Sequence, residues 1–239
     1  MPKMSAARSS SAKDQAKKQE LPPTRQVVRH RVRSMLQSMI LNGDKRPGSK
    51  LVQLQLAKQL GVAQGVVREA LLELQACGLV ESIDNRGVYV TEINTDKLIE
   101  SFEVREMHEG LAARLCCERI TRADLRQLQE LADKAYEMAQ RGKIQEMAAL
   151  DRDLHARIVH LCGNGMLIRL ADNYRVFGKI VRVNRDAVVV HDEHVTILKA
   201  IEQGDGDQAE ALMRQHIRAA RQALHEHIAQ KRFDLSWLL

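Results

Sequence analysis

The feature that most constrains the fold is the helical periodicity of the second part of the chain. From Thr95 onward, apolar residues recur at three- and four-residue spacing, which is typical of amphipathic α-helices. Aromatic residues make up only 3% of the chain, so the core must be largely aliphatic, which suits packed helices. The short run Val188–Val190 is also β-prone and stays ambiguous. We predict six helices, over residues 95–120, 122–140, 144–162, 166–184, 187–203 and 207–231.

The first part of the chain has a different pattern. A helical run from Val27 to Leu41 ends at Asn42-Gly43, and two short helical runs follow over 53–60 and 64–77. Two β-prone runs come next, over residues 79–83 and 87–91, joined across Asp84-Asn85-Arg86. Three helices followed by a hairpin predict a winged helix-turn-helix. The predicted fold class is therefore mainly α, an N-terminal winged helix-turn-helix with a C-terminal all-α bundle.

These patterns divide the chain into four segments. The 239 residues are enough for two modest cores. We expect a flexible basic tail over 1–22, a winged helix-turn-helix over 23–93, an all-helical domain over 94–232 and a C-terminal tail over 233–239. In the C-terminal tail, Phe233 and Trp237 are expected to pack on the bundle or on a partner chain.

Positive charge is concentrated in the N-terminal part. Residues 1–93 hold 15 Lys and Arg against 8 Asp and Glu, whereas the rest of the chain holds 22 against 23. A net charge that is positive only in this part favours a polyanion as its partner. Together with the predicted winged helix-turn-helix, this points to double-stranded DNA.

Membrane insertion and secretion are not expected. No apolar run approaches the roughly 20 residues of a membrane span, and the first 20 residues lack the apolar core of a secretory signal. The four cysteines fall within apolar helical patterns and show no C-x-x-C spacing, which favours buried free thiols in a reducing compartment. We expect a cytoplasmic protein that is associated with the nucleoid when bound to DNA.

The predicted recognition helix and wing carry the candidate DNA contacts. A recognition helix enters the major groove with its N-terminal residues, here Gln64, Gly65 and Arg68. Gln64 can pair with adenine, and Arg68 with guanine or a phosphate. At the wing tip, Arg86 and Gly87 can approach a minor groove or a phosphate. The first helix offers further phosphate contacts through its arginines, which are Arg29, Arg31 and Arg33.

Asp151 and His155 lie one helical turn apart beside an apolar stripe. On a 100° wheel, Asp153 lies about 160° from His155 and His160 about 140° away, so neither can share a site with that pair. Two further histidines, His194 and His216, interrupt apolar stripes downstream.

A buried imidazole without a partner costs about 1–3 kcal/mol, so the buried histidines need either a metal ion or hydrogen-bonding partners. Both alternatives are open from spacing alone. One carboxylate and three imidazoles would suit Zn²⁺, Ni²⁺, Mn²⁺ or Fe²⁺. His191 is expected near the pocket or in solvent, and the other histidines at the surface or rim, namely His108, His160, His225 and His227.

The run LAKQLGVAQGVVREALLELQACGLVESIDNRGVYV resembles the winged-helix signature of GntR-family bacterial transcription regulators, and the resemblance covers residues 25–92. Arg68 and Gly87 match family positions. The chain departs from the family at Ala63-Gln64-Gly65-Val66, where the usual residues are Ser, Arg, a small residue and Pro. Because Gln64 replaces the arginine that commonly reads bases, the operator preference is expected to differ.

The second part resembles the FCD effector domain of FadR-type GntR regulators over residues 95–230. The family pattern D-x-x-F/L-H, "N..l", "H..I..AI..GD...A" and "m..H" reads here as DRDLH, NGML, HVTILKAIEQGDGDQA and MRQH. The resemblance implies a divalent metal ion, with Zn²⁺ the first choice, held by Asp151, His155, His194 and His216. The segment REMHEGLAA matches "R...E..AA", which implies that Arg105 and Glu109 face a pocket where Arg105 binds a carboxylate effector.

The expected function is ligand-responsive transcription regulation by a homodimer that responds to a small carboxylate or sugar acid. Repression relieved by the effector is the commoner logic, and activation is the alternative. No enzymatic activity is expected. Two alternatives stay open: a regulator that senses the metal alone, and a metal-dependent hydrolase with a DNA-binding head. The hydrolase is disfavoured because no H-E-x-x-H or similarly placed general base accompanies Asp151 and His155.

Overall fold

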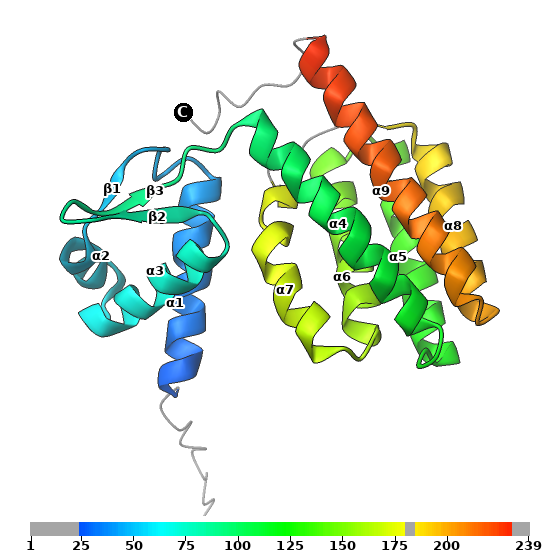
Figure 1. The fold of residues 1–239 in the computed structure, drawn as a ribbon, viewed down its shortest axis with the longest axis horizontal. Helices are drawn as coiled ribbons and strands as arrows, with labels where there is room; N and C mark the ends of the chain where they lie inside the picture. Colours follow the sequence, from blue (N-terminus) through cyan, green and yellow to red (C-terminus); the bar gives the residue numbers. More distant parts are fainter. Residues whose placement is uncertain (1–23, 180–184, 231–239) are drawn as a thin grey trace, which may run out of the picture.

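The computed structural model describes residues 24–179 and 185–230, which form two lobes joined by the short segment over residues 91–94 (Figure 1). The predicted tails over 1–22 and 233–239, with the packing expected of Phe233 and Trp237, lie outside the described residues.

The first lobe is the predicted winged helix-turn-helix. It comprises α1 (Arg25–Leu41), β1 (Lys50–Leu51), α2 (Gln53–Leu60), α3 (Gln64–Ala76), β2 (Val80–Ile83) and β3 (Gly87–Val90). The three strands form an antiparallel sheet in the order β1-β3-β2, with Lys50 opposite Tyr89 and Val80 opposite Val90. Sequence reasoning missed β1, because two residues are too few to show an alternating pattern. The β2–β3 hairpin is the wing, and Asn85 at its tip has a φ of 58°.

Local signals in the sequence account for the helix-turn-helix. Gly61 ends α2 in the left-handed region with a φ of 65°, which costs a glycine little and turns the chain toward α3. The apolar faces of the helices and the sheet meet in a core of fully buried side chains, including Leu36, Val67, Leu74 and Leu79.

The second lobe is entirely helical over its described residues. It comprises α4 (Thr95–Cys116), α5 (Arg122–Gln140), α6 (Ile144–Leu161), α7 (Gly165–Arg175), the 3-10 turn η1 (Phe177–Lys179), α8 (Ala187–Glu202) and α9 (Gly206–Ala229). The helix expected over 166–184 is too long: α7 ends at Arg175, before a 3-10 turn that contains the poor helix former Gly178. The ambiguous run Val188–Val190 lies inside α8, whose first turn is capped by the Asp186 carboxylate.

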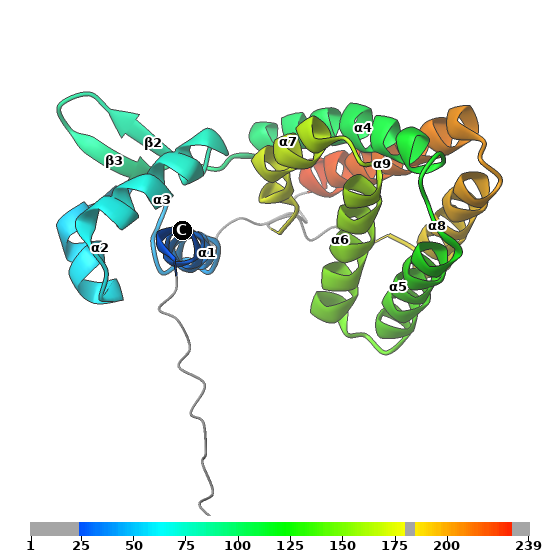
Figure 2. The ribbon, with the colours of Figure 1, turned by 90° about the horizontal axis from the view of Figure 1, so that it is seen from below.

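The helices α4 and α9 pack side by side along the lobe (Figures 1 and 2). Their close approach depends on Gly110, where a Cβ atom would lie 2.6 Å from Cγ of Arg214. Glu106 on α4 accepts hydrogen bonds from Arg214 and Arg218 on α9. The helices α5, α6 and α8 enclose a space against α4 and α9, and α7 packs on α4. No helix within 24–179 or 185–230 is long and apolar enough to cross a membrane.

Candidate functional site

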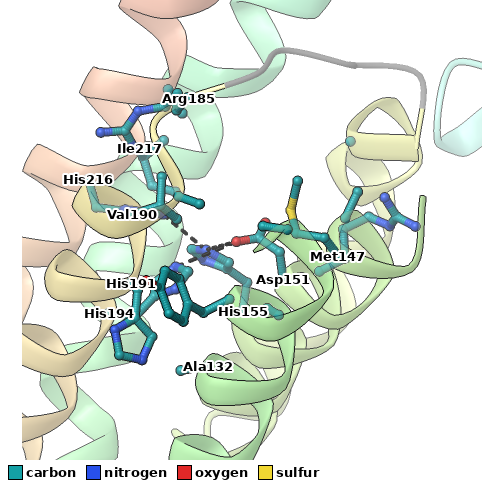
Figure 3. Close-up of a pocket in the computed structure, with 18 of the residues that line it drawn as sticks. Ala132, Met147, Asp151, His155, Arg185, Val190, His191, His194, His216 and Ile217 are labelled. Atoms are coloured by element: carbon teal, nitrogen blue, oxygen red, sulfur yellow. Dashed lines mark hydrogen bonds and ion pairs between the residues drawn. The ribbon is translucent and has the colours of Figure 1, made fainter. Parts of the chain in front are cut away.

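Four potential metal ligands from three helices meet inside the helical lobe (Figure 3). Asp151 and His155 come from α6, His194 from α8 and His216 from α9. One ligand atom of each residue lies within 4.8 Å of those of the other three. The His216 Nε2 atom is 3.2 Å from Nε2 of His155, and the His194 Nε2 atom is 3.5 Å from Oδ1 of Asp151. The structure thus brings together the four residues singled out in the sequence.

Two further carboxylates fix the orientation of the rings. The His155 Nδ1 atom lies 2.7 Å from Oε2 of Glu109, and the His216 Nδ1 atom lies 2.6 Å from Oε2 of Glu193. Each carboxylate accepts a hydrogen bond from Nδ1–H, which leaves the Nε2 lone pair of each ring facing the cluster. Two such lone pairs 3.2 Å apart repel each other, and a cation between them would remove the repulsion.

Burial keeps the imidazoles of His194 and His216 in the neutral form, which is the form that binds metals. His194 is 3% exposed, and burial together with neighbouring His216 lowers its pKa well below the usual value. Burial is also the main cause that lowers the pKa of His216. Among the buried polar atoms of the described residues, Nε2 of His194 lacks a hydrogen-bond partner. Neutral imidazoles, a carboxylate and an orphaned buried nitrogen fit a divalent cation.

The cluster opens onto a cavity of about 150 Å³ (Figure 3). A cavity of about that volume in another protein accommodates a benzene molecule, so a small organic molecule fits here. Much of the wall is apolar, formed by residues such as Phe102, Ala132, Ala135, Met147 and Val190. Its polar residues outside the cluster include Arg105, Arg152, Arg185 and His191.

Arg105 lines the cavity as the resemblance implies, but its guanidinium is already paired. Its Nε atom donates to Oε1 of Glu109 at 2.9 Å, and the ring of Phe102 lies below its guanidinium. Glu109 therefore holds both Arg105 and His155, and its pKa is lowered by these two partners despite complete burial. Sequence reasoning placed Glu109 on the pocket side without assigning it this bridging role.

The structure corrects the expectation for one histidine. His108 was expected at the surface but is buried, because α7 packs on that side of α4. Its Nε2 atom donates to the backbone oxygen of Leu167 at 2.7 Å, and the Tyr174 hydroxyl donates to its Nδ1 at 2.8 Å. His191 lines the cavity, with Nε2 2.9 Å from Oδ1 of Asp133.

Two of the other histidines lie at the surface as expected. His160 and His225 are exposed, whereas His227 is partly buried and bonds to a backbone oxygen of its own helix.

All five candidate DNA contacts on the recognition helix and wing are exposed. Gln64 and Gly65 form the first turn of α3, and Arg68 follows one turn later. Arg86 and Gly87 lie at the end of the wing, where β3 begins. The arrangement leaves an arginine on each element free to reach a duplex.

The arginines of α1 divide into two groups. Arg25 and Arg29 form ion pairs with glutamates of α3, the Arg29 Nε atom lying 2.8 Å from Oε1 of Glu73. Arg33 also approaches Glu73. These contacts fasten α1 to the recognition helix. Arg31 is exposed and lies about 200° from Arg29 on the helical wheel, on the side of α1 away from these pairs.

Comparisons with known proteins agree with this architecture. Residues 28–90 match the family model described as bacterial regulatory proteins, gntR family, and residues 100–219 match the FCD domain model. The HTH-type transcriptional regulator LutR of Bacillus subtilis is 30% identical over 204 residues, which cover 75% of this chain and 93% of LutR. A probable D-xylose utilization operon transcriptional repressor of Paenarthrobacter nicotinovorans is 28% identical over 82% of this chain and 88% of its own length. The solved structure of McbR/YncC from Escherichia coli superposes with a TM-score of 0.68 at 22% identity, covering 84% of this chain and 98% of that chain.

Proposed function

Because the chain belongs to the gntR family of bacterial regulatory proteins and carries an FCD domain, it is a DNA-binding transcriptional regulator, and we propose that its helical lobe binds a divalent metal ion and a small organic acid that set its affinity for an operator. Regulation rather than catalysis is its activity. The observation that carries the proposal is the convergence of three imidazoles and one carboxylate at the wall of a cavity.

The proposed ligands are Asp151, His155, His194 and His216, with Zn²⁺ the first choice for this donor set and Ni²⁺, Mn²⁺ or Fe²⁺ as alternatives. A divalent cation held by these residues would supply an open coordination position for a carboxylate of the effector. Glu109 and Glu193 would keep the rings of His155 and His216 in the ligating tautomer.

The effector we propose is a small carboxylate or sugar acid. The cavity favours an effector with few atoms, and the arginines in its wall favour an anion. In this proposal Arg105 acts mainly through Glu109, which it holds against His155. Relief of repression is the logic we favour, supported by a relative named as a repressor.

We propose that Gln64, Gly65 and Arg68 contact bases or phosphates in the major groove, and that Arg86 and Gly87 of the wing contact the flanking backbone. Their exposure on α3 and at the wing supports this assignment. For Arg31 we propose a contact to a phosphate and not to a base, because it lies away from the side of α1 that faces α3. Since the partner is DNA, we propose the bacterial cytoplasm as the location.

A route for the signal runs from the cavity to the winged lobe. The pKa of Tyr174 is raised by its burial and by the nearby Glu109 carboxylate, so the two side chains are electrostatically coupled. Tyr174 and Phe177 together line a cleft whose other wall includes Gly78 of the winged lobe. The Phe177 ring lies 3.8 Å from the position that a Cβ atom would take on Gly78. A shift of Glu109 on effector binding would therefore reach the DNA-binding lobe through α7 and η1.

An exposed apolar surface on α4 and α7 supports the proposed homodimer. It consists of Val104, Met107 and Leu111 on α4 and Met166 and Leu170 on α7, all at least 39% exposed. The two helices contact each other through His108 and Leu167. Large side chains of this kind at helical spacing are what a second copy of the chain would cover.

Metal analysis of the purified full-length chain tests the site. We expect about one divalent ion per wild-type chain and less than about a tenth of that in the double variant His155→Ala/His216→Ala, because two of four ligands are lost. His160→Ala, which removes an exposed histidine of the same helix, should keep the full content. Stoichiometric metal in the double variant would contradict the site.

The alternative of a pure metal sensor is separated from the proposal by operator binding. For a sensor, chelation alone would change operator affinity and no organic acid would do so. Turnover of an acid by the loaded protein would instead favour the metal-dependent hydrolase considered from the sequence.

A further inference from the structure

Among the residues that the structure describes, three arginines line the cavity, and they are not equivalent. Arg105 donates to Glu109, and Arg185 donates to Glu193 through its Nη2 atom at 2.6 Å. These ion pairs neutralise both guanidinium groups. Arg152 is the exception, because it makes no hydrogen bond or ion pair with any residue of the described ranges.

The carboxylates closest to Arg152 do not bind it. Asp151 and Asp153, its neighbours in the chain, attract it electrostatically without a contact. Asp153 is exposed, and Asp151 has its Oδ1 atom 3.5 Å from Nε2 of His194. Arg152 is therefore a half-buried cation whose hydrogen-bonding groups are available to a ligand.

The surroundings of Arg152 are cationic on the side of η1. The pKa of Lys179 is lowered first by its burial and then by three positive charges near it, which belong to Arg152, Arg175 and Arg33. The aliphatic part of Arg152 lies near Gly178, 4.0 Å from the position that a Cβ atom would take there. Of these four cations only Arg152 lines the cavity, and the positive potential around it favours the binding of an anion.

We propose that the pocket selects a small dicarboxylate, with one carboxylate at the three-histidine site and the other on the guanidinium of Arg152. The three-histidine site is the cluster formed by Asp151, His155, His194 and His216. This inference rests on the proposed function, which requires only that some organic acid binds at the metal. The small and apolar side chains of the wall suit a short aliphatic chain between the two carboxylates. A cavity of about 150 Å³ favours short acids over long ones.

Arg152 would contribute specificity through a charge-assisted, bidentate hydrogen bond. A monocarboxylate would leave its guanidinium without a partner, whereas a dicarboxylate of suitable length would pair it. The chain-length optimum among dicarboxylates would report the separation between the two binding points.

Isothermal titration calorimetry on the Zn²⁺-loaded full-length protein tests this. The probes are malonate, succinate, glutarate and adipate, each compared with the monocarboxylate of the same number of carbons. We expect the best dicarboxylate to bind at least about tenfold more tightly than its matched monocarboxylate. In Arg152→Gln this advantage should fall to less than about twofold, and Arg152→Lys should keep part of it.

Arg126→Gln is the matched control, since it removes one exposed arginine of α5 that takes no part in the cavity. It should retain the wild-type preference. Equal affinity for both series in the wild type, or an undiminished preference in folded Arg152→Gln, would overturn the assignment while leaving an organic-acid effector intact. Binding of neither series would contradict the proposed effector itself and this inference with it.

Discussion

Burial of imidazole groups gives the metal-free protein a defined dependence on pH. The pKa values of His194 and His216 lie below 6.5, the usual value, because both rings are buried. As the pH falls below 6.5, the unfolded chain takes up protons that the folded chain does not, so stability is lost. The loss is about 1.4 kcal/mol per pH unit for each histidine until its folded pKa is reached.

Urea unfolding of the chelated protein at pH 7.5, 6.5 and 5.5 measures this effect above the usual pKa range of the carboxyl groups. In His194→Gln the free energy of unfolding should depend less steeply on pH, by the amount that corresponds to the uptake of about one proton. A free energy of unfolding that is unchanged between pH 6.5 and 5.5 would contradict the burial of these rings as neutral groups.

At the residue scale, the proposed DNA contacts on the recognition helix predict which substitutions change operator binding. Arg68→Ala and Gln64→Ala should each weaken binding to the preferred operator by about 1–3 kcal/mol and relax the base preference at one position. Arg86→Ala should weaken binding to all sequences alike and reduce its salt dependence.

Fluorescence anisotropy with an operator obtained by in vitro selection measures both effects. Arg126→Ala, an exposed arginine of the helical lobe, is the control and should leave affinity unchanged. If Arg68→Ala kept full affinity and base preference, α3 would not be the reading element.

Among the helices, α7 is the element that we propose links the cavity to the winged lobe. Tyr174→Phe removes the hydroxyl that donates to His108 and lies near Glu109, but keeps the ring. Metal content and operator affinity without acid should be unchanged. The change in operator affinity caused by an acid should shrink by about 1 kcal/mol, the net value of one hydrogen bond. An undiminished response in Tyr174→Phe would exclude this route.

Helix types and the wing were predictable because their apolar spacing is a local property. The four cluster residues were also accessible, since Asp151 and His155 share a turn and two later imidazoles interrupt apolar stripes. The supporting glutamates were not, because Glu109 is 46 residues from His155 and Glu193 is 23 from His216. Such pairing depends on how the helices pack rather than on spacing.

The same reason explains why the burial of His108 was missed. Its burial depends on α7 packing against α4, and no local pattern around residue 108 reports a second helix on that side. The break at Arg175 was missed because the apolar spacing continues past it while the chain turns at Gly178.

At the scale of the whole molecule, the exposed apolar surface of α4 and α7 should decide the oligomeric state. Met107→Glu/Leu170→Glu places two charges on it, so we expect the wild type to be a dimer and the variant a monomer at the same micromolar concentration, each with full metal content. Light scattering coupled to size-exclusion chromatography measures this. Ile144→Glu puts a charge on an exposed apolar residue of α6 and should remain dimeric. A wild-type monomer, or a dimeric double variant, would contradict this surface as the interface.

The central claim is that an acid bound at the three-histidine site changes operator affinity. The direct measurement is operator binding by the Zn²⁺-loaded protein across a panel of small carboxylates, in the wild type and in His155→Ala/His216→Ala. We expect at least one acid to change the wild-type dissociation constant about tenfold or more and to leave that of the double variant unchanged. An operator affinity insensitive to every acid, or an equal response in the double variant, would contradict the claim.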